Sequence, residues 1–389
     1  MRGNERSYSA PRVVAIAGVT LALAYSIVLG GALIAGQWLL DPQGRPLASD
    51  FVNVWAAGRL ALDGNAALAY DWTAHKAAEI TAVGHPFDNY FGWHYPPPFL
   101  FAAAALALLP FLPAAMFWLA ATLPLYAFAI RSIVGERAGY FLALGFPAAL
   151  WNAAAGQNGF LTAALIGGTL TLLERRPVLA GVCLGLLAYK PHFGLLFPLA
   201  LIAGARWRVI AGAAATAGLM IVLSLLAFGS ESWTAFFHWM PATSAAVLGQ
   251  GLADFDRLQS LFGLIRAHGG SETLAWGVQA ATTLALAVTI FHLWRSKTEF
   301  ALKAAALAAA ALIATPYLYM YDLVVLAVPV AYLVRVGLAR GFSRVELIGL
   351  PAAGLLLLIY PYLKTQVGLA AVLIVAGLVV QRVIGHRAR

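Results

Sequence analysis

Long apolar runs recur along the chain and limit the folds that it can adopt. The first extends from Val13 to Leu40, and many later windows approach the roughly 20 apolar residues that are needed to cross a bilayer. Of the 389 residues, 62% are hydrophobic, and the mean hydropathy is +0.81. A soluble chain of this length could not bury so much apolar surface in one core. The sequence therefore predicts an all-α, polytopic integral membrane protein with a single membrane domain over residues 1–389.

The few charged residues are unevenly distributed, and their distribution predicts the topology. Seven short segments between the apolar runs contain 18 of the 25 lysines and arginines but only five acidic residues. Residues 41–95 contain three basic and six acidic residues, and residues 229–272 contain two and four. Under the positive-inside rule both termini are cytoplasmic, and 41–95 and 229–272 are the outer loops. The net charge of +9 then reflects orientation, and no nucleic-acid partner is expected.

The segment around Lys190 is too short for two crossings. Only 29 residues separate Arg176 from Arg206, both expected on the cytoplasmic side, whereas two crossings need about 40. A re-entrant hairpin with its tip at "YKPHFG", residues 189–194, fits this length, and its proline suits a helix break. Lys190 and Asp322 then lie at or inside membrane depth, where an ionisable group is expensive and usually functional.

Residues 96–130 hold two helical stretches, although two crossings would place the basic residues that follow on the outside. We therefore expect one crossing, with a helix over 96–110 at or dipping into the outer face. The first outer loop contains an amphipathic helix over 51–62, with its apolar side against lipid or protein, that would rest on the outer leaflet. In all, 10–12 transmembrane or re-entrant helices are expected. The others cover residues 138–155, 157–173, 207–228, 273–294, 299–316, 318–338, 345–362 and 366–385.

Several polar residues of the first outer loop are candidates for chemistry. Asp50 lies at the start of the amphipathic helix, where a carboxylate is either a helix cap or a general base held just above the bilayer. Arg59 of the same helix and His94 and Tyr95 of "FGWHYPPPF" are candidates for substrate binding. The aromatic residues of that stretch also suit an interfacial belt.

Two further pairs of residues could contact a sugar or a phosphate. Gln157 and Asn158 in "WNAAAGQNGF" are either an ordinary polar turn or donors and acceptors for sugar hydroxyls. Lys190 and His192 at the buried hairpin tip need a compensating partner. A lipid phosphate would supply it, and so would Asp322 as a structural ion pair.

The remaining candidates lie near the outer ends of other helices. Tyr319 and Asp322 in "TPYLYMYD" could bind substrate, or could only cap a helix and join the aromatic belt. Arg257 in the second outer loop could supply a cation. It follows Asp254-Phe255-Asp256, which has the Asp-x-Asp spacing of metal–nucleotide-sugar sites, but on the face where nucleotide sugars are scarce. No metal and no cofactor is expected.

Taken in order, several segments resemble glycosyltransferase family 87. They are "SDFVNVWAAGRLALDGNAALAYD", "YPPPFLF", "GQNGFLTAAL" and "AGVCLGLLAYKPHFGLLFPLALIAGARWR". Each motif is loose alone, but the ordered set is fairly specific. Members of the family include polyprenol-phosphate-mannose-dependent alpha-1,2-mannosyltransferases with the GT-C fold. Two stretches depart from the family pattern, "TPYLYMYD" and "DRLQSLFGLIR", and both bear on the sugar and the acceptor.

The resemblance implies a GT-C-type bundle that transfers a hexose or pentose, with mannose favoured, from a polyprenyl-phosphate donor. The acceptor would be a glycan or glycolipid hydroxyl at the outer face of the cytoplasmic membrane, and membrane lipids would be the other partners. Asp50 would be the catalytic base and Lys190 would contact the donor phosphate, with His192 or Arg257 as a further cation. The reaction would invert the anomeric carbon.

Two other functions fit parts of the sequence. A secondary transporter could use Lys190 and Asp322 as a coupling site beside a broken helix. Transporters more often have repeat symmetry and short loops on both sides, whereas the two long outer loops here suit chemistry on one face. A non-catalytic lipid-binding or scaffold protein is the third possibility.

Overall fold

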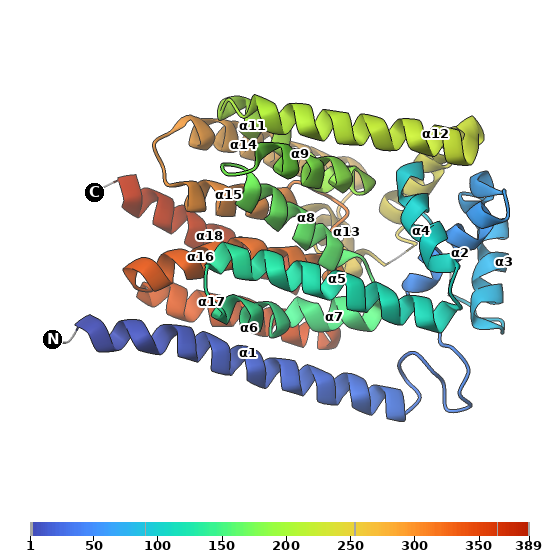
Figure 1. Ribbon diagram of the computed structural model, residues 1–389, viewed down its shortest axis with the longest axis horizontal. Helices are drawn as coiled ribbons and strands as arrows, with labels where there is room; N and C mark the ends of the chain where they lie inside the picture. The colour runs from blue at the N-terminus through green and yellow to red at the C-terminus, as the bar shows by residue number, and fades with distance from the viewer. Residues whose placement is uncertain (1–2, 90, 253, 364, 388–389) are drawn as a thin grey trace.

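The protein is a bundle of helices. The computed structural model describes residues 3–89, 91–252, 254–363 and 365–387, and within these ranges it contains no strand (Figure 1). The predicted all-α class is confirmed. Six helices of the described ranges are long and apolar enough to cross a membrane. They are α1 (Gly3–Ile34), α5 (Phe111–Val134), α12 (Trp207–Ser244), α14 (Glu272–Arg295), α16 (Ala327–Arg340) with the 3-10 turn η6 (Met320–Leu326) before it, and α18 (Val367–Arg387).

Shorter helices fill the space between the long ones. They are α6 (Ala138–Leu144), α7 (Pro147–Ala155), α8 (Gly159–Leu172), α15 (Phe300–Ile313) and α17 (Arg344–Ile359). Most residues of α15 and α16 are buried, so these two helices form the centre of the bundle. The predicted helix over 138–155 is broken between α6 and α7 at Gly145. A Cβ added at Gly145 would lie 2.5 Å from the Cα of Gly18 in α1, which requires glycine at this crossing.

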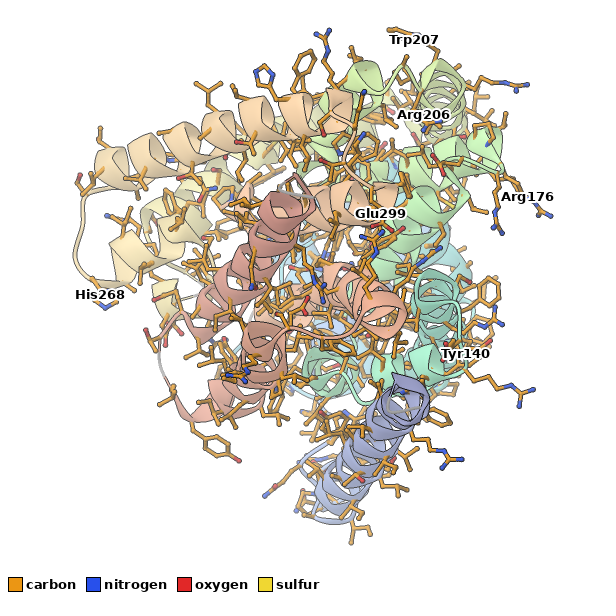
Figure 2. The ribbon with its side chains drawn as sticks, turned by 90° about the vertical axis from the view of Figure 1, so that its left-hand side faces the viewer. Tyr140, Arg176, Arg206, Trp207, His268 and Glu299 are labelled. Carbon is orange, nitrogen blue, oxygen red and sulfur yellow. The ribbon has the colours of Figure 1, made fainter. Side chains whose placement is uncertain are left out.

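The bundle has two distinct ends. The start of α1 and the end of α18 lie at one end, at the left of Figure 1, and α2 (Phe51–Leu62), α3 (Trp72–Val83) and α4 (Leu100–Ala107) lie at the other. We call these the terminal end and the loop end. Figure 2 views the terminal end, where Arg206 Nη2 lies 3.0 Å from Glu174 Oε1 and Arg340 Nη2 lies 2.9 Å from Glu299 Oε2. Both termini are thus on one side, as predicted; that this side is cytoplasmic stays a prediction.

The segment around Lys190 forms the expected hairpin. The chain passes through α9 (Pro177–Leu186), the turn η3 (Leu187–Tyr189), α10 (Pro191–Gly194) and α11 (Phe197–Ala203). Lys190 has φ −130° and ψ 70°, so the helix breaks immediately before Pro191. Glu174 and Arg206 lie just before and just after the hairpin, and their ion pair shows that the chain enters and leaves it at the terminal end. The position of the break and the return of the chain are therefore confirmed.

Helix α12 consists of two helices joined across a kink at Gly229, which has φ 73° and ψ 165°. The helix predicted over 207–228 is therefore confirmed as the part before the kink, and at 1.5 Å per residue it is roughly 33 Å long, close to the roughly 30 Å bilayer core. The part after the kink, to Ser244, lies in the predicted second outer loop. It reaches the loop end, where the Trp239 and Trp72 rings stack with centroids 5.9 Å apart.

The apolar face of α2 is buried against protein, and the contact of this helix with the outer leaflet stays a prediction. Phe51, Val52 and Val54 are buried, and α2 packs against α3, α4 and the 3-10 turn η1 (Ala66–Ala69) between α2 and α3. The crossing with α4 is very close at Gly58, where an added Cβ would lie 2.0 Å from the carbonyl oxygen of Ala103. Helix α4 has only eight residues and follows a 3-10 turn at Pro97–Phe99, so between 96 and 130 α5 alone is long and apolar enough to cross a membrane, which agrees with the predicted single crossing.

We expect Gly58→Ala to destabilise the loop end. The added methyl group has no space against the Ala103 carbonyl, and forced overpacking costs typically about 1–3 kcal/mol. Thermal unfolding of the purified protein should therefore begin at a lower temperature. Gly31→Ala in α1 is the matched control, because no atom lies within 4 Å of its added Cβ. Equal melting temperatures for the two variants would contradict the close crossing of α2 and α4.

Candidate active site

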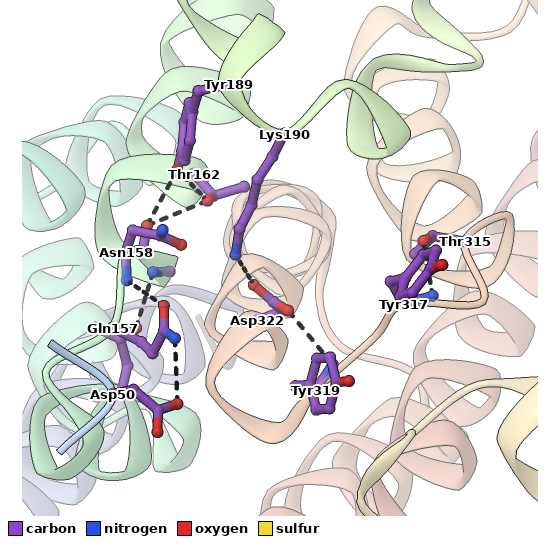
Figure 3. A network of polar contacts seen from close by, with 12 residues as sticks. Asp50, Gln157, Asn158, Thr162, Tyr189, Lys190, Thr315, Tyr317, Tyr319 and Asp322 are labelled. Atoms are coloured by element: carbon purple, nitrogen blue, oxygen red, sulfur yellow. Dashed lines mark hydrogen bonds and ion pairs between the residues drawn. The ribbon is translucent and has the colours of Figure 1, made fainter. Parts of the chain in front are cut away.

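Asp50 lies at the N-terminus of α2, but its side chain does not cap that helix. The structure gives it no hydrogen bond to the N–H groups of the first turn. Its Oδ2 instead accepts a hydrogen bond from Gln157 Nε2 at 3.1 Å (Figure 3). Of the two alternatives for this carboxylate, the helix cap is therefore wrong. The partly buried side chain is aimed at a polar network formed by other helices.

The polar network that contacts Asp50 starts at the turn between α7 and α8. Gln157 Oε1 accepts hydrogen bonds from the Tyr95 hydroxyl at 3.3 Å and from the backbone N–H of Asn158 at 3.2 Å. Asn158 Nδ2 donates to the Tyr95 hydroxyl at 2.7 Å. All three side chains are buried. The first outer loop and the Gln157-Asn158 turn, which are far apart in the sequence, therefore form one site.

Two residues of this network are not among those selected from the sequence. The hydroxyls of Thr162 and Tyr189 lie 2.6 Å apart, and the Tyr189 hydroxyl is 3.3 Å from the carbonyl oxygen of Asn158. Thr162 follows Asn158 by four residues on α8, so the two share one helix face. That spacing is a usable sequence signal. Tyr189 precedes Lys190 at the break of the hairpin, and only the fold shows that it turns toward α8.

A buried ion pair forms the other side of the site. Lys190 Nζ donates a hydrogen bond to Asp322 Oδ1 at 2.6 Å, and both side chains are almost fully buried. Asp322 Oδ2 also accepts from the backbone N–H of Tyr319 at 3.3 Å. The ring of Tyr321 lies with its centroid 5.5 Å from Lys190 Nζ. The ion-pair alternative for Lys190 is confirmed, and among the described residues Asp322 is its one hydrogen-bonding partner.

Asp50 and the ion pair act on each other electrostatically. Burial raises the pKa of the Asp50 carboxyl to about 6. The hydrogen bond from Gln157 and the positive charges of Arg257 and Lys190 act against this rise, and the negative charge of Asp322 adds to it. Figure 3 shows Asp50 and the Lys190–Asp322 pair on two sides of one region, with the Gln157-Asn158 turn beside them. A carboxylate that ionises near neutral pH thus lies close to a buried cation.

The other residues selected from the sequence lie at the edge of this site or outside it. Arg59 is exposed and pairs with Asp63 on α2, with Nη2 and Oδ1 2.7 Å apart, so it does not join the network. His94 is exposed, although the adjacent Tyr95 is buried. His192 lies beside Tyr317, with ring centroids 6.3 Å apart. Arg257 is mostly exposed and its Nε is 3.4 Å from Asp254 Oδ2.

The arrangement provides groups for proton transfer, anion binding and sugar recognition. Asp50 can accept a proton, and the Lys190 ammonium has three donor hydrogens, of which one is used by Asp322. Asn158 Oδ1 is buried and accepts no hydrogen bond from the described residues. A buried acceptor without a partner costs free energy, which a hydroxyl of a bound ligand could recover.

Comparison with protein families gives a match over most of the membrane domain. Residues 93–316, more than half of the chain, match glycosyltransferase family 87. The matched range includes Gln157, Asn158 and Lys190, whereas Asp50 and Asp322 lie outside it. Searches of curated proteins and of solved structures gave no match. On the strength of the family match and of the six long apolar helices, the chain belongs to glycosyltransferase family 87 and is a membrane glycosyltransferase.

Proposed function

We propose that the protein transfers a hexose or pentose, with mannose as the first candidate, from a polyprenyl-phosphate donor to a hydroxyl of a glycan or glycolipid. The transfer takes place at the outer face of the cytoplasmic membrane. The observation that carries this proposal is the pairing of a partly buried carboxylate, Asp50, with a buried ammonium, Lys190, at the loop end of a membrane bundle. One group suits an acceptor hydroxyl and the other suits a phosphate.

The proposed reaction is a single displacement. Asp50 takes the proton of the acceptor hydroxyl, and the oxygen forms a bond to the anomeric carbon on the face opposite the phosphate. The bond between that carbon and the phosphate oxygen breaks, and polyprenyl phosphate leaves with the electron pair. The anomeric configuration is therefore inverted. The phosphate is a stable leaving anion, so the protein mainly supplies positioning and the charge of Lys190, with Arg257 or His192 beside it.

An apolar groove supports a lipid-linked donor. It has a volume of about 1150 Å³ and lies between α1 and α17, with walls that include Gly18 and Leu357. Its lining also includes Leu326 of η6, four residues after Asp322. A surface of this composition within the spanning part of the bundle suits a hydrocarbon chain.

The direct test is reconstitution of the purified protein in liposomes that contain polyprenyl-phosphate mannose and candidate glycolipid acceptors. We expect a glycosylated acceptor and free polyprenyl phosphate in equal amounts. A nucleotide sugar in place of the lipid-linked donor should give no product. Transfer from the nucleotide sugar alone would contradict the proposed donor. Uptake of a solute without any transfer would instead favour the secondary transporter with Lys190 and Asp322 as its coupling site, an alternative that the family match disfavours.

The rate of transfer should depend on pH with a midpoint near 6. A general base works in its ionised form, and burial raises the pKa of Asp50 to about 6. We expect kcat/KM to be constant above this pH and to fall about tenfold per pH unit below it. The measurement is a profile of kcat/KM between pH 4.5 and 8. A profile that stays flat down to pH 4.5 would exclude a base with a raised pKa.

A further inference from the structure

The hydrogen bonds of Gln157 determine which of its amide atoms faces Asp50. Its Oε1 accepts from the backbone N–H of Asn158, a group that can only donate. Its Nε2 must then be the atom that lies 3.1 Å from Asp50 Oδ2, and an ionised carboxylate can only accept. A reversed amide would place oxygen against oxygen at one contact and N–H against N–H at the other. The orientation therefore follows from the partners themselves.

The turn that carries Gln157 is held against the start of α2. Gly156 has φ 69°, in the left-handed region, and a Cβ added there would lie 2.9 Å from the Cβ of Phe51. On the other side of the turn, the backbone N–H of Gly159 donates to Asn152 Oδ1 at 2.9 Å. The turn is therefore fixed both to α2 and to α7. The backbone that carries Gln157 cannot move away from α2 without disturbing these contacts.

The two oxygens of Asp50 have different surroundings. Oδ2 is bound by Gln157, whereas Oδ1 has no hydrogen-bond partner among the described residues. We propose that Gln157 is a positioning residue: it holds Oδ2 and so presents Oδ1 as the atom that takes the proton from the acceptor. This inference rests on the proposed function, in which Asp50 is the general base. It assigns Gln157 to Asp50 and not to the sugar.

The hydrogen-bonding capacity of Gln157 favours this assignment over sugar binding. Both lone pairs of Oε1 are used, by Asn158 and by the Tyr95 hydroxyl, and one of the two Nε2 hydrogens is used by Asp50. A single N–H remains for a ligand. Asn158, with a buried and unpartnered Oδ1, is the better candidate for a sugar hydroxyl.

The test compares Gln157→Met and Tyr95→Phe with the unchanged protein in proteoliposomes. Loss of a hydrogen bond to a charged group should lower kcat by about 10- to 100-fold in Gln157→Met, with little change in KM for the donor. Because the Gln157 hydrogen bond lowers the pKa of Asp50, its loss should move the midpoint of the pH profile upward by about one pH unit. Tyr95→Phe removes the hydroxyl that donates to Gln157 Oε1 and accepts from Asn158 Nδ2 but leaves the bond from Gln157 to Asp50, so it should shift the midpoint in the same direction but less.

Gln279→Met controls for the general effect of deleting a buried amide. Gln279 accepts from the Phe262 N–H at 3.3 Å and donates to the Ile313 carbonyl at 2.9 Å, away from Asp50. We expect it to lower the melting temperature and to leave the pH midpoint unchanged. An unchanged midpoint in Gln157→Met, or a raised KM for the sugar donor with normal kcat, would overturn the positioning role. Failure of the proposed function gives a different result, because kcat/KM of the unchanged protein would then not fall below pH 6.

Discussion

Asp50→Asn is expected to lower sugar transfer by about 10²–10⁴-fold, which is the usual contribution of a general base. The amide has nearly the same shape as the carboxylate, and its side-chain oxygen can still accept the hydrogen bond from Gln157. It cannot take a proton from the acceptor. Burial already disfavours the charged form of Asp50, so the neutral amide should not destabilise the fold. Donor binding should stay near normal, because Lys190 and Asp322 are unchanged.

Asp88→Asn is the matched control for this substitution. Asp88 belongs to the same outer segment, is exposed, and has no part in the polar network. The initial rate of product formation from lipid-linked donor checks both variants, and binding of donor to the purified protein shows whether the site is intact. Near-normal transfer by Asp50→Asn would exclude Asp50 as the base. Equal losses in both variants would indicate a general effect of charge in this segment.

Removal of the Lys190 charge is expected to have two separate effects. Lys190→Met leaves Asp322 buried without its partner, and breaking a buried pair in this way costs about 3–5 kcal/mol. The melting temperature should fall sharply. Donor affinity should also fall, by about 10- to 100-fold, because a charge-assisted hydrogen bond to the phosphate is lost.

The double variant Lys190→Met with Asp322→Asn separates these effects. No unpaired charge is left, and the amide oxygen can still accept from the Tyr319 N–H, so most of the lost stability should return. Donor affinity should stay low, since the cation is still absent. Thermal unfolding and a donor-binding titration measure the two quantities. A stable double variant that binds donor as well as the unchanged protein would show that Lys190 has only a structural role.

The sequence predicts the helical bundle, the helix break at Lys190 and the single crossing by α5, because apolar run lengths, prolines and charge counts are local signals. It also predicts that the Lys190 charge needs a partner and offers Asp322 as one candidate. The partner of Lys190 could not be predicted from sequence, since Lys190 and Asp322 are 132 positions apart and meet only in the folded bundle, where α8 packs against both the hairpin and η6.

Packing decides the features that the sequence does not predict. The apolar pattern of α2 fits a helix that lies on a leaflet as well as one that is covered by other helices. The need for glycine at position 58 follows from the close approach of α4, which the sequence does not predict. Gly229 ends the helix over 207–228 as the sequence suggests, but the sequence does not predict that a second helix follows to Ser244 and packs on the first outer loop. Gln157 as the partner of Asp50, 107 positions away, likewise depends on the crossing of α2 by the α7–α8 turn.

The residues matched by the family begin after Asp50 and end before Asp322, so the roles of these two carboxylates rest on geometry alone. The most direct test of that geometry is an experimental structure of the protein with a non-transferable analogue of a polyprenyl-phosphate sugar. We predict the phosphate within about 3 Å of Lys190 Nζ and the sugar between it and Asp50, with the anomeric carbon turned toward the carboxylate. A phosphate bound away from Lys190, or a sugar that Asp50 does not face, would contradict the proposed reaction.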